Sequence, residues 1–213
     1  MNDRPARLAA GAISLATLLA MIPATISSSA EHGGLLAGIW ALLRFFTITT
    51  NLLVGIGFGL IALRSREALS PRLLGGLVLA IMLVGVVFNL LLGGLDHATI
   101  WDALGDHVHH KVMPLVVPLW WLAFAGHGRL TWRDAFWWAL YPLAYCAYIF
   151  LRVGLETPGG GIAYPYFFMD ADRLGYLRAF ANMGAIAVGF VVTGLGVVAL
   201  DGRLGRRAKG VAG

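Results

Sequence analysis

Two segments of the chain carry the side chains best suited to chemistry, namely RFFTITTN at residues 44–51 and DHVHHKVMP at residues 106–114. A threonine hydroxyl becomes a nucleophile when a neighbouring base removes its proton. Histidine titrates in the range that this role requires near neutral pH. If the two segments meet in the fold, they could form a hydrolase site, with arginine or asparagine side chains stabilising an oxyanion or holding a carboxylate.

The first segment places three polar side chains on one side of a predicted continuous helix. Arg44, Thr47 and Asn51 are three and seven residues apart and therefore share a face. Thr50 lies at the edge of this face, whereas Thr49 points away and can bond to a carbonyl of its own helix. We predict Thr47 as the nucleophile, with Arg44 and Asn51 as supports, and back-bonding within the helix is the alternative for Thr47.

The second segment favours His110 as the base. On a helix, His107 and His110 lie on neighbouring turns of one side, whereas His109 points elsewhere. Pro114 has no N–H to donate to the carbonyl of His110, so the helix should bend there and leave an acceptor free at that level. We therefore predict His110 as the general base and retain His107 and His109 as candidate supporting residues.

The same cluster also suggests a metal site as an alternative. Together with His97, Asp102 and Asp106, the histidines offer imidazole and carboxylate ligands. Zinc requires three or four converging ligands, but the adjacent His109 and His110 diverge on a helix. Membrane di-iron hydroxylases use several histidine boxes, whereas this chain has one cluster. We therefore expect neither a metal nor another cofactor.

A second alternative has no catalysis. A helical bundle could bind or transport a small amphiphile through the same polar residues, with arginines meeting an anionic head group. Close helix packing, which the glycines Gly55, Gly57 and Gly59 would allow, suits either function and does not discriminate between them.

Transmembrane helices must position these residues. Hydrophobic residues make up 59% of the 213-residue chain and charged residues only 13%, about half the charged share of a typical soluble domain. The apolar runs are long enough to span a bilayer and are continuous rather than alternating, which indicates helices rather than strands. The sequence predicts an all-α polytopic membrane protein that forms a single six-helix domain over residues 1–213, with spans at 8–27, 38–63, 72–93, 110–126, 134–155 and 178–200.

The charge of the connecting segments predicts the orientation. Arginine and lysine gather before the first run, after the second, after the fourth and after the last, and acidic residues dominate the other connections. The positive-inside rule then places both termini in the cytoplasm. The net charge of +5 is thus explained by the basic segments on the cytoplasmic side of the membrane. We therefore expect membrane lipids, and no nucleic acid, as partners. A signal peptide cleaved near residues 27–30 is the alternative for the first run and would leave five spans in the same orientation.

This orientation places the two polar segments in the outer half of the membrane. Asn89 lies near the outer end of the third span, Arg152 near that of the fifth, and Asn182 one turn into the sixth. We therefore expect all three to border one outer-half pocket. Tyr164 belongs to the loop at residues 159–170, which is expected to anchor the chain at the interface or to cover the pocket as a lid.

Three stretches together resemble the androgen-induced-gene and androgen-dependent TFPI-regulating family of six-span membrane proteins, which has a bacterial branch named for its six spans. They are LLRFFTITTNLLVG at residues 42–55, DHVHHKVMPLVVPLWW at residues 106–121, and GGGIAYPYFFMD at residues 159–170. Their order and spacing agree with the family over almost the whole chain. The resemblance implies an integral protein of a bacterial cytoplasmic membrane.

Animal members of that family hydrolyse fatty acid esters of hydroxy fatty acids with a threonine nucleophile and a histidine. By position, the resemblance implies Thr47 as the threonine and His110 or His109 as the histidine, and helical phase favours His110. A lipid-like ester is therefore the expected substrate. The bacterial form departs from the expected animal motif by three further polar residues, Thr49, Thr50 and Asn51. This difference argues against a shared substrate more than it argues against a shared pocket.

Overall fold

The structure, a computed structural model, describes residues 3–93, 99–155 and 164–211, and within these ranges all regular secondary structure is helical. The chain divides into two compact units, each of which is described by itself. The first unit comprises Met1–Leu130 with Gly202–Gly213, and the second comprises Thr131–Asp201.

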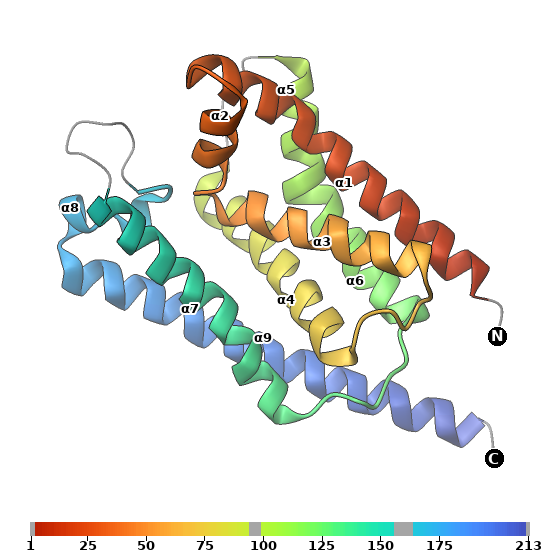
Figure 1. Cartoon of the computed structure of the whole chain (residues 1–213). Coiled ribbons are helices and arrows are strands. Elements are labelled where there is room, and N and C mark those ends of the chain that lie inside the picture. Colours follow the sequence, from red (N-terminus) through yellow and green to blue (C-terminus); the bar gives the residue numbers. More distant parts are fainter. Residues whose placement is uncertain (1–2, 94–98, 156–163, 212–213) are drawn as a thin grey trace. The chain divides into compact units, whose positions relative to one another are not determined.

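The first unit contains the two segments of the predicted site. Its helices, labelled in Figure 1, are α1 (Arg4–Glu31), α2 (Leu35–Leu42), α3 (Phe46–Leu63), α4 (Pro71–Val87), α5 (Ile100–His107) and α6 (Met113–Phe124). A π-helical turn, η1 (Phe88–Leu92), extends α4, and a second one, η2 (Val108–Val112), joins α5 to α6 without a break.

The second unit consists of two long helices and the short elements between them. These elements are α7 (Trp132–Leu155), the 3-10 turn η3 (Phe167–Met169), α8 (Ala171–Leu174) and α9 (Tyr176–Val211), the last turns of which belong to the first unit.

Five helices of the described residues are long and apolar enough to cross a membrane, which is compatible with an all-α integral membrane protein. They are Arg4–Glu31, Phe46–Leu63, Pro71–Leu92, Trp132–Leu155 and Tyr176–Ala208. The predicted span 110–126 is not among them. It is part of a longer helical stretch from Ile100 to Phe124, whose first half carries two carboxylates, three histidines and a lysine. Six spans therefore stay a prediction.

The predicted single helix over residues 38–63 is wrong, because the chain turns at residues 43–45 between α2 and α3. A tertiary contact holds α2 against the end of α1: a Cβ on Gly38 would lie 2.5 Å from the backbone nitrogen of Ser29. The hydroxyl of Ser28 also donates to the carbonyl of Gly38 at 3.0 Å. As a result, Arg44 lies in the turn, off the helix face of Thr47, and Thr47 lies in the first turn of α3.

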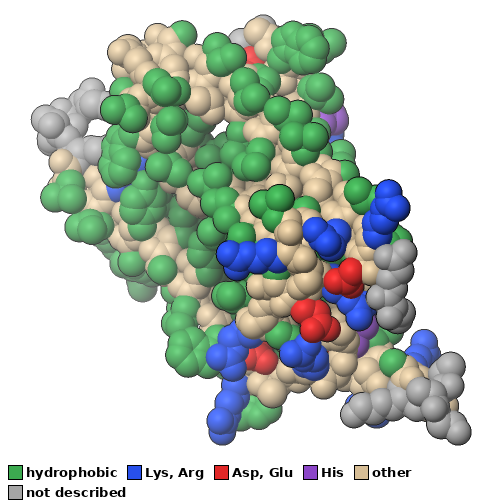
Figure 2. All heavy atoms as spheres, turned by 45° about the vertical axis from the view of Figure 1, so that its right-hand side comes forward, with side chains coloured by type: hydrophobic (Ala, Val, Ile, Leu, Met, Phe, Trp, Pro, Cys, Tyr) green, Lys and Arg blue, Asp and Glu red, His purple; other side chains and the backbone are tan. Residues whose placement is uncertain are grey.

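Arg7, Arg66 and Asp3 of the first unit lie where α1 begins and α3 ends. Figure 2 shows blue Lys and Arg and red Asp and Glu side chains gathered in one part of the face in view, and green hydrophobic side chains over much of the rest. Arg7 donates to the carbonyls of Ala62 and Leu63 at 2.9 and 3.2 Å, which satisfies the C-terminal end of α3. Arg66 pairs with Asp3 at 3.0 Å. The RFFTITTN segment lies at the opposite end of α3. This distribution is compatible with cytoplasmic termini, and the orientation itself stays a prediction.

Small side chains allow α1 and α3 to pack closely. The hydroxyl of Ser14 donates to the carbonyl of Gly55 at 2.7 Å. A Cβ on Gly55 would lie 2.6 Å from Leu18 Cδ2, and one on Gly59 would lie 3.1 Å from the Ser14 hydroxyl. Glycine thus permits a helix contact stabilised by a hydroxyl, as is common between membrane helices.

An equally close contact joins α4 to the stretch that carries the histidines. A Cβ on Gly85 would lie 2.6 Å from Cβ and 2.9 Å from Cγ of Pro114. Because the proline ring is rigid and is fixed to its helix backbone, it cannot move away as a flexible side chain could.

Replacing Gly85 by alanine should therefore destabilise the protein by about 1–3 kcal/mol, the usual cost of overpacking. The measurement is thermal or denaturant unfolding of the protein in detergent micelles. Gly184→Ala is the matched control, because nothing lies within 4 Å of a Cβ at this position on α9. There, alanine should be neutral or mildly stabilising. Equal stability of the two variants would contradict the rigid contact at Gly85.

Candidate active site

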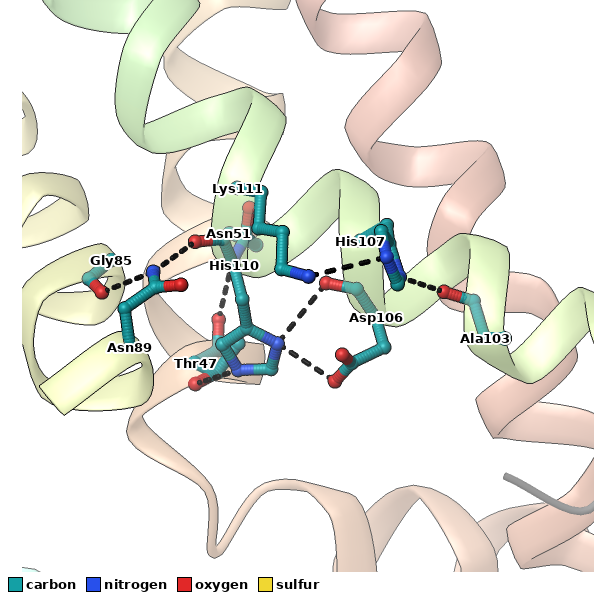
Figure 3. A network of polar contacts seen from close by, with 9 residues as sticks. All are labelled: Thr47, Asn51, Gly85, Asn89, Ala103, Asp106, His107, His110 and Lys111. Atoms are coloured by element: carbon teal, nitrogen blue, oxygen red, sulfur yellow. Dashed lines mark hydrogen bonds and ion pairs between the residues drawn. The ribbon is translucent and has the colours of Figure 1, made fainter. Parts of the chain in front are cut away.

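Thr47 and His110, which the sequence predicted as nucleophile and base, lie in direct contact. The Thr47 hydroxyl oxygen is 3.0 Å from Nε2 of His110 (Figure 3). Thr47 comes from the first turn of α3 and His110 from η2. Both are half-buried, and the His110 side chain is 12% exposed. The pair is therefore largely shielded from the surroundings.

The surroundings of His110 determine which ring nitrogen accepts a proton. Nδ1 lies 2.8 Å from Oδ1 of Asp106 and 3.1 Å from the Asp106 carbonyl oxygen. Both atoms are acceptors, so Nδ1 donates, and Nε2 of the neutral ring is left to accept from the Thr47 hydroxyl. Phe88 stacks on the ring with centroids 3.9 Å apart and an interplanar angle of 15°. The ring is thus held in its plane on one face and at both nitrogens.

One part of the effect predicted for Pro114 is observed, namely a His110 carbonyl that accepts from outside its own helix, and the bend stays a prediction. The helix forms a π turn over Val108–Val112, and the carbonyl of His110, for which Pro114 has no N–H, accepts from the Asn89 side chain at 3.4 Å. Asn89 also donates to the Gly85 carbonyl at 2.7 Å. The amide of Asn89 therefore connects α4 to the histidine segment.

Asn51 and His109 join the site to α1. The Thr17 hydroxyl donates to Oδ1 of Asn51 at 3.0 Å, and Nδ2 of Asn51 donates to the Thr47 carbonyl at 3.0 Å. His109 Nε2 donates to the Thr17 carbonyl at 3.0 Å. Thr17 and Asn51 are fully buried, and His109 is 4% exposed. His109 is thus engaged with α1, and the ring that meets Thr47 is that of His110.

His107 does not share the position of His110. It is exposed, its Nδ1 donates to the Ala103 carbonyl at 2.9 Å, and its Nε2 accepts from Nζ of Lys111 at 3.2 Å. The π turn changes the number of residues per turn, so two residues three apart no longer lie one above the other. His107 therefore forms a surface pair with Lys111 beside the site.

Three other predicted residues belong to the second unit, and their place beside Thr47 stays a prediction. Arg152 is buried and donates to the Tyr148 hydroxyl at 2.9 Å. Asn182 donates to the Phe168 carbonyl at 2.9 Å, and Tyr164 is buried. Each therefore has a structural contact within its own unit.

In the described ranges, no three His, Cys, Asp or Glu side chains converge as a metal site would require. His97, one of the candidate ligands, lies outside these ranges. Asp102 instead accepts from the hydroxyls of Thr99 at 2.7 Å and Ser27 at 3.3 Å.

Asp106 is the residue of the site that sequence reasoning missed, because it was considered only as a metal ligand. Its signal was the spacing of four residues to His110, which places the two side chains next to each other on a helix.

No family model, no curated protein and no solved structure matches the chain. The resemblance to the androgen-induced-gene family therefore stays a prediction that rests on the three sequence motifs.

The contact between Thr17 and Asn51 generates a stability prediction. Thr17→Val keeps the shape of the side chain but leaves the buried Oδ1 of Asn51 without its donor, which should cost about 1 kcal/mol. The measurement is unfolding in detergent micelles. Thr193→Val is the control, because this exposed hydroxyl only returns to the Gly189 carbonyl of its own helix. A loss no larger than that of Thr193→Val would contradict a stabilising contact.

Proposed function

We propose that the protein is an intramembrane hydrolase of lipid-like esters, with Thr47 as the nucleophile and His110 as the general base. The single observation that carries the proposal is the 3.0 Å contact between the Thr47 hydroxyl and Nε2 of His110. A nucleophile and a base within hydrogen-bond reach, with the base oriented by a third group, are the signature of covalent catalysis.

The reaction follows from the positions of the protons. Nε2 of His110 takes the proton of Thr47 as Oγ1 attacks the ester carbonyl carbon. The tetrahedral intermediate then releases the alcohol, which receives that proton, and leaves an acyl-threonine. Water attacks the acyl-threonine, with His110 again taking the proton, and the carboxylic acid leaves with Thr47 restored.

The chain around the site supports a lipid-like substrate. Apolar side chains dominate the helix surfaces of the first unit, including Leu53 and Ile56 on α3 and Leu115 and Leu119 on α6. A hydrophobic ester could approach along such surfaces from the acyl region of a bilayer. In this proposal the protein lies in a bacterial cytoplasmic membrane with six spans and both termini inside. Arg44 would assist as a cationic support for the oxyanion or for a substrate carboxylate.

A fluorophosphonate probe tests this proposal, because it phosphonylates an activated hydroxyl without requiring the natural ester. We expect labelling of the purified protein, located at Thr47 by mass spectrometry of its peptides. Thr47→Ala should abolish labelling, and His110→Ala should slow it by about 10²–10⁴-fold, the usual contribution of a general base.

Thr49→Ala and His107→Ala are the matched controls. The Thr49 hydroxyl returns to the Phe46 carbonyl of its own helix, and His107 pairs with Lys111, so both variants should label at the wild-type rate. Labelling that persists in Thr47→Ala would remove the proposed nucleophile. A wild-type protein that does not label would favour the alternative of an amphiphile-binding protein without catalysis.

A further inference from the structure

We propose that Asp106 is the positioning residue that holds His110 with its proton on Nδ1 and with Nε2 directed at Thr47. The consequence for catalysis rests on the proposed function, whereas the consequence for the histidine ring does not. The observation that carries the proposal is the contact between a carboxylate that is 11% exposed and the ring nitrogen opposite the threonine (Figure 3).

The geometry favours the carboxylate as the group that controls the ring. Oδ1 of Asp106 is 2.8 Å from Nδ1, and the two side chains are 11% and 12% exposed. A hydrogen bond to an ionised carboxylate is stronger than one to a neutral carbonyl, so Oδ1 dominates over the Asp106 carbonyl oxygen at 3.1 Å. A carboxylate that is only 11% exposed is costly unless it is hydrogen-bonded, and the Nδ1–H of His110 supplies a donor.

The carboxylate also matches the charge that the reaction would create. When Nε2 takes the proton of Thr47, the His110 ring becomes a cation with N–H groups on both sides. Oδ1 of Asp106, 2.8 Å from Nδ1, then faces a positively charged ring. Its negative charge would stabilise this cation in a site that is largely shielded. Phe88 restrains the ring by stacking, but it makes no distinction between the two nitrogens. Asp106 therefore determines which ring nitrogen of His110 carries the proton, and Phe88 determines the plane of the ring.

The neighbouring charged groups have other contacts. Asp102, one turn earlier on α5, accepts from Thr99 and Ser27, and Lys111 donates to His107. Asp102 is therefore a matched control: the same side chain on the same helix, directed to hydroxyls instead of a histidine.

The Asp106→Asn substitution preserves the shape of the side chain but gives it an amide that can donate to Nδ1. The neutral ring can then carry its proton on Nε2, directed at the Thr47 oxygen, where it cannot accept the threonine proton. The ring would remain in place, and only the proton would move. A role limited to packing would not produce this change.

Nuclear magnetic resonance of the full chain in nanodiscs, with ¹⁵N-labelled histidine, measures the tautomer directly through long-range ¹H–¹⁵N correlations. His110→Gln identifies the signals of His110 among the six histidines. We expect protonated Nδ1 and unprotonated Nε2 in the wild type and in Asp102→Asn, and a shift of the proton to Nε2 in Asp106→Asn. A wild-type ring protonated on Nε2, or an unchanged tautomer in Asp106→Asn, would overturn the proposal.

The fluorophosphonate reaction then measures the consequence. Asp106→Asn should lower the maximal labelling rate by about 10²–10⁴-fold with little change in the probe concentration for half-maximal rate, because ring orientation and not probe binding is lost. Asp106→Glu should recover part of the rate, and Asp102→Asn should keep it. If the wild-type protein is not labelled, the proposed hydrolase is refuted. The tautomer of His110, measured by magnetic resonance, still tests the role of Asp106 in that case. If the Asp106→Asn protein is labelled at the wild-type rate, the positioning role of Asp106 is refuted and the proposed hydrolase is not.

Discussion

The close contact between Gly85 and Pro114 is the constraint on which the position of His110 depends. Without a side chain at residue 85, α4 approaches the proline ring closely enough for two neighbouring residues of η1, which extends α4, to reach the histidine. Phe88 stacks on its ring, and Asn89 donates to its carbonyl, which Pro114 leaves without a backbone donor. The contact between α4 with η1 and the histidine segment therefore depends on four residues together, namely Gly85, Pro114, Phe88 and Asn89.

The polar groups around this contact divide into a deeply buried part and a half-buried part that contains the proposed catalytic pair. Thr17, Asn51 and His109 are deeply buried and satisfy each other or nearby backbone, which connects α1 to α3 and to the histidine segment. Thr47 and His110 are half-buried and satisfy each other through groups that can exchange a proton. Asn51 borders both parts, because its amide donates to the Thr47 carbonyl. Buried polar groups that are fully paired stabilise a unique packing, which a reactive pair needs for its alignment.

Sequence reasoning succeeded where the cause was local or compositional. Four of the predicted spans coincide with long apolar helices, and the second coincides with one only over Phe46–Leu63. The availability of the His110 carbonyl follows from the missing N–H of Pro114. The pairing of Thr47 with His110 was predicted from residue chemistry, helical phase and the family resemblance together. The turn before α3 was not predicted, because residues 38–63 were treated as one apolar run, whereas Gly38 packs α2 against Ser29 of α1. The π turns, which contain Phe88 and His110, were also missed, because the apolar pattern of the sequence does not distinguish a π turn from an α-helical one.

The missed turn changes the chemical setting of the threonine. On an uninterrupted helix, Thr47 would lie in the interior, where its hydroxyl usually bonds back to a carbonyl one turn earlier. Because α3 begins at Phe46, the carbonyls of a preceding helical turn are not aligned for that bond, and the hydroxyl instead meets Nε2 of His110. The first turn of a helix also carries the positive end of the helix dipole, which favours negative charge nearby. The same break that separates Arg44 from the helix face thus places the Thr47 hydroxyl at the positive end of α3, where negative charge is favoured.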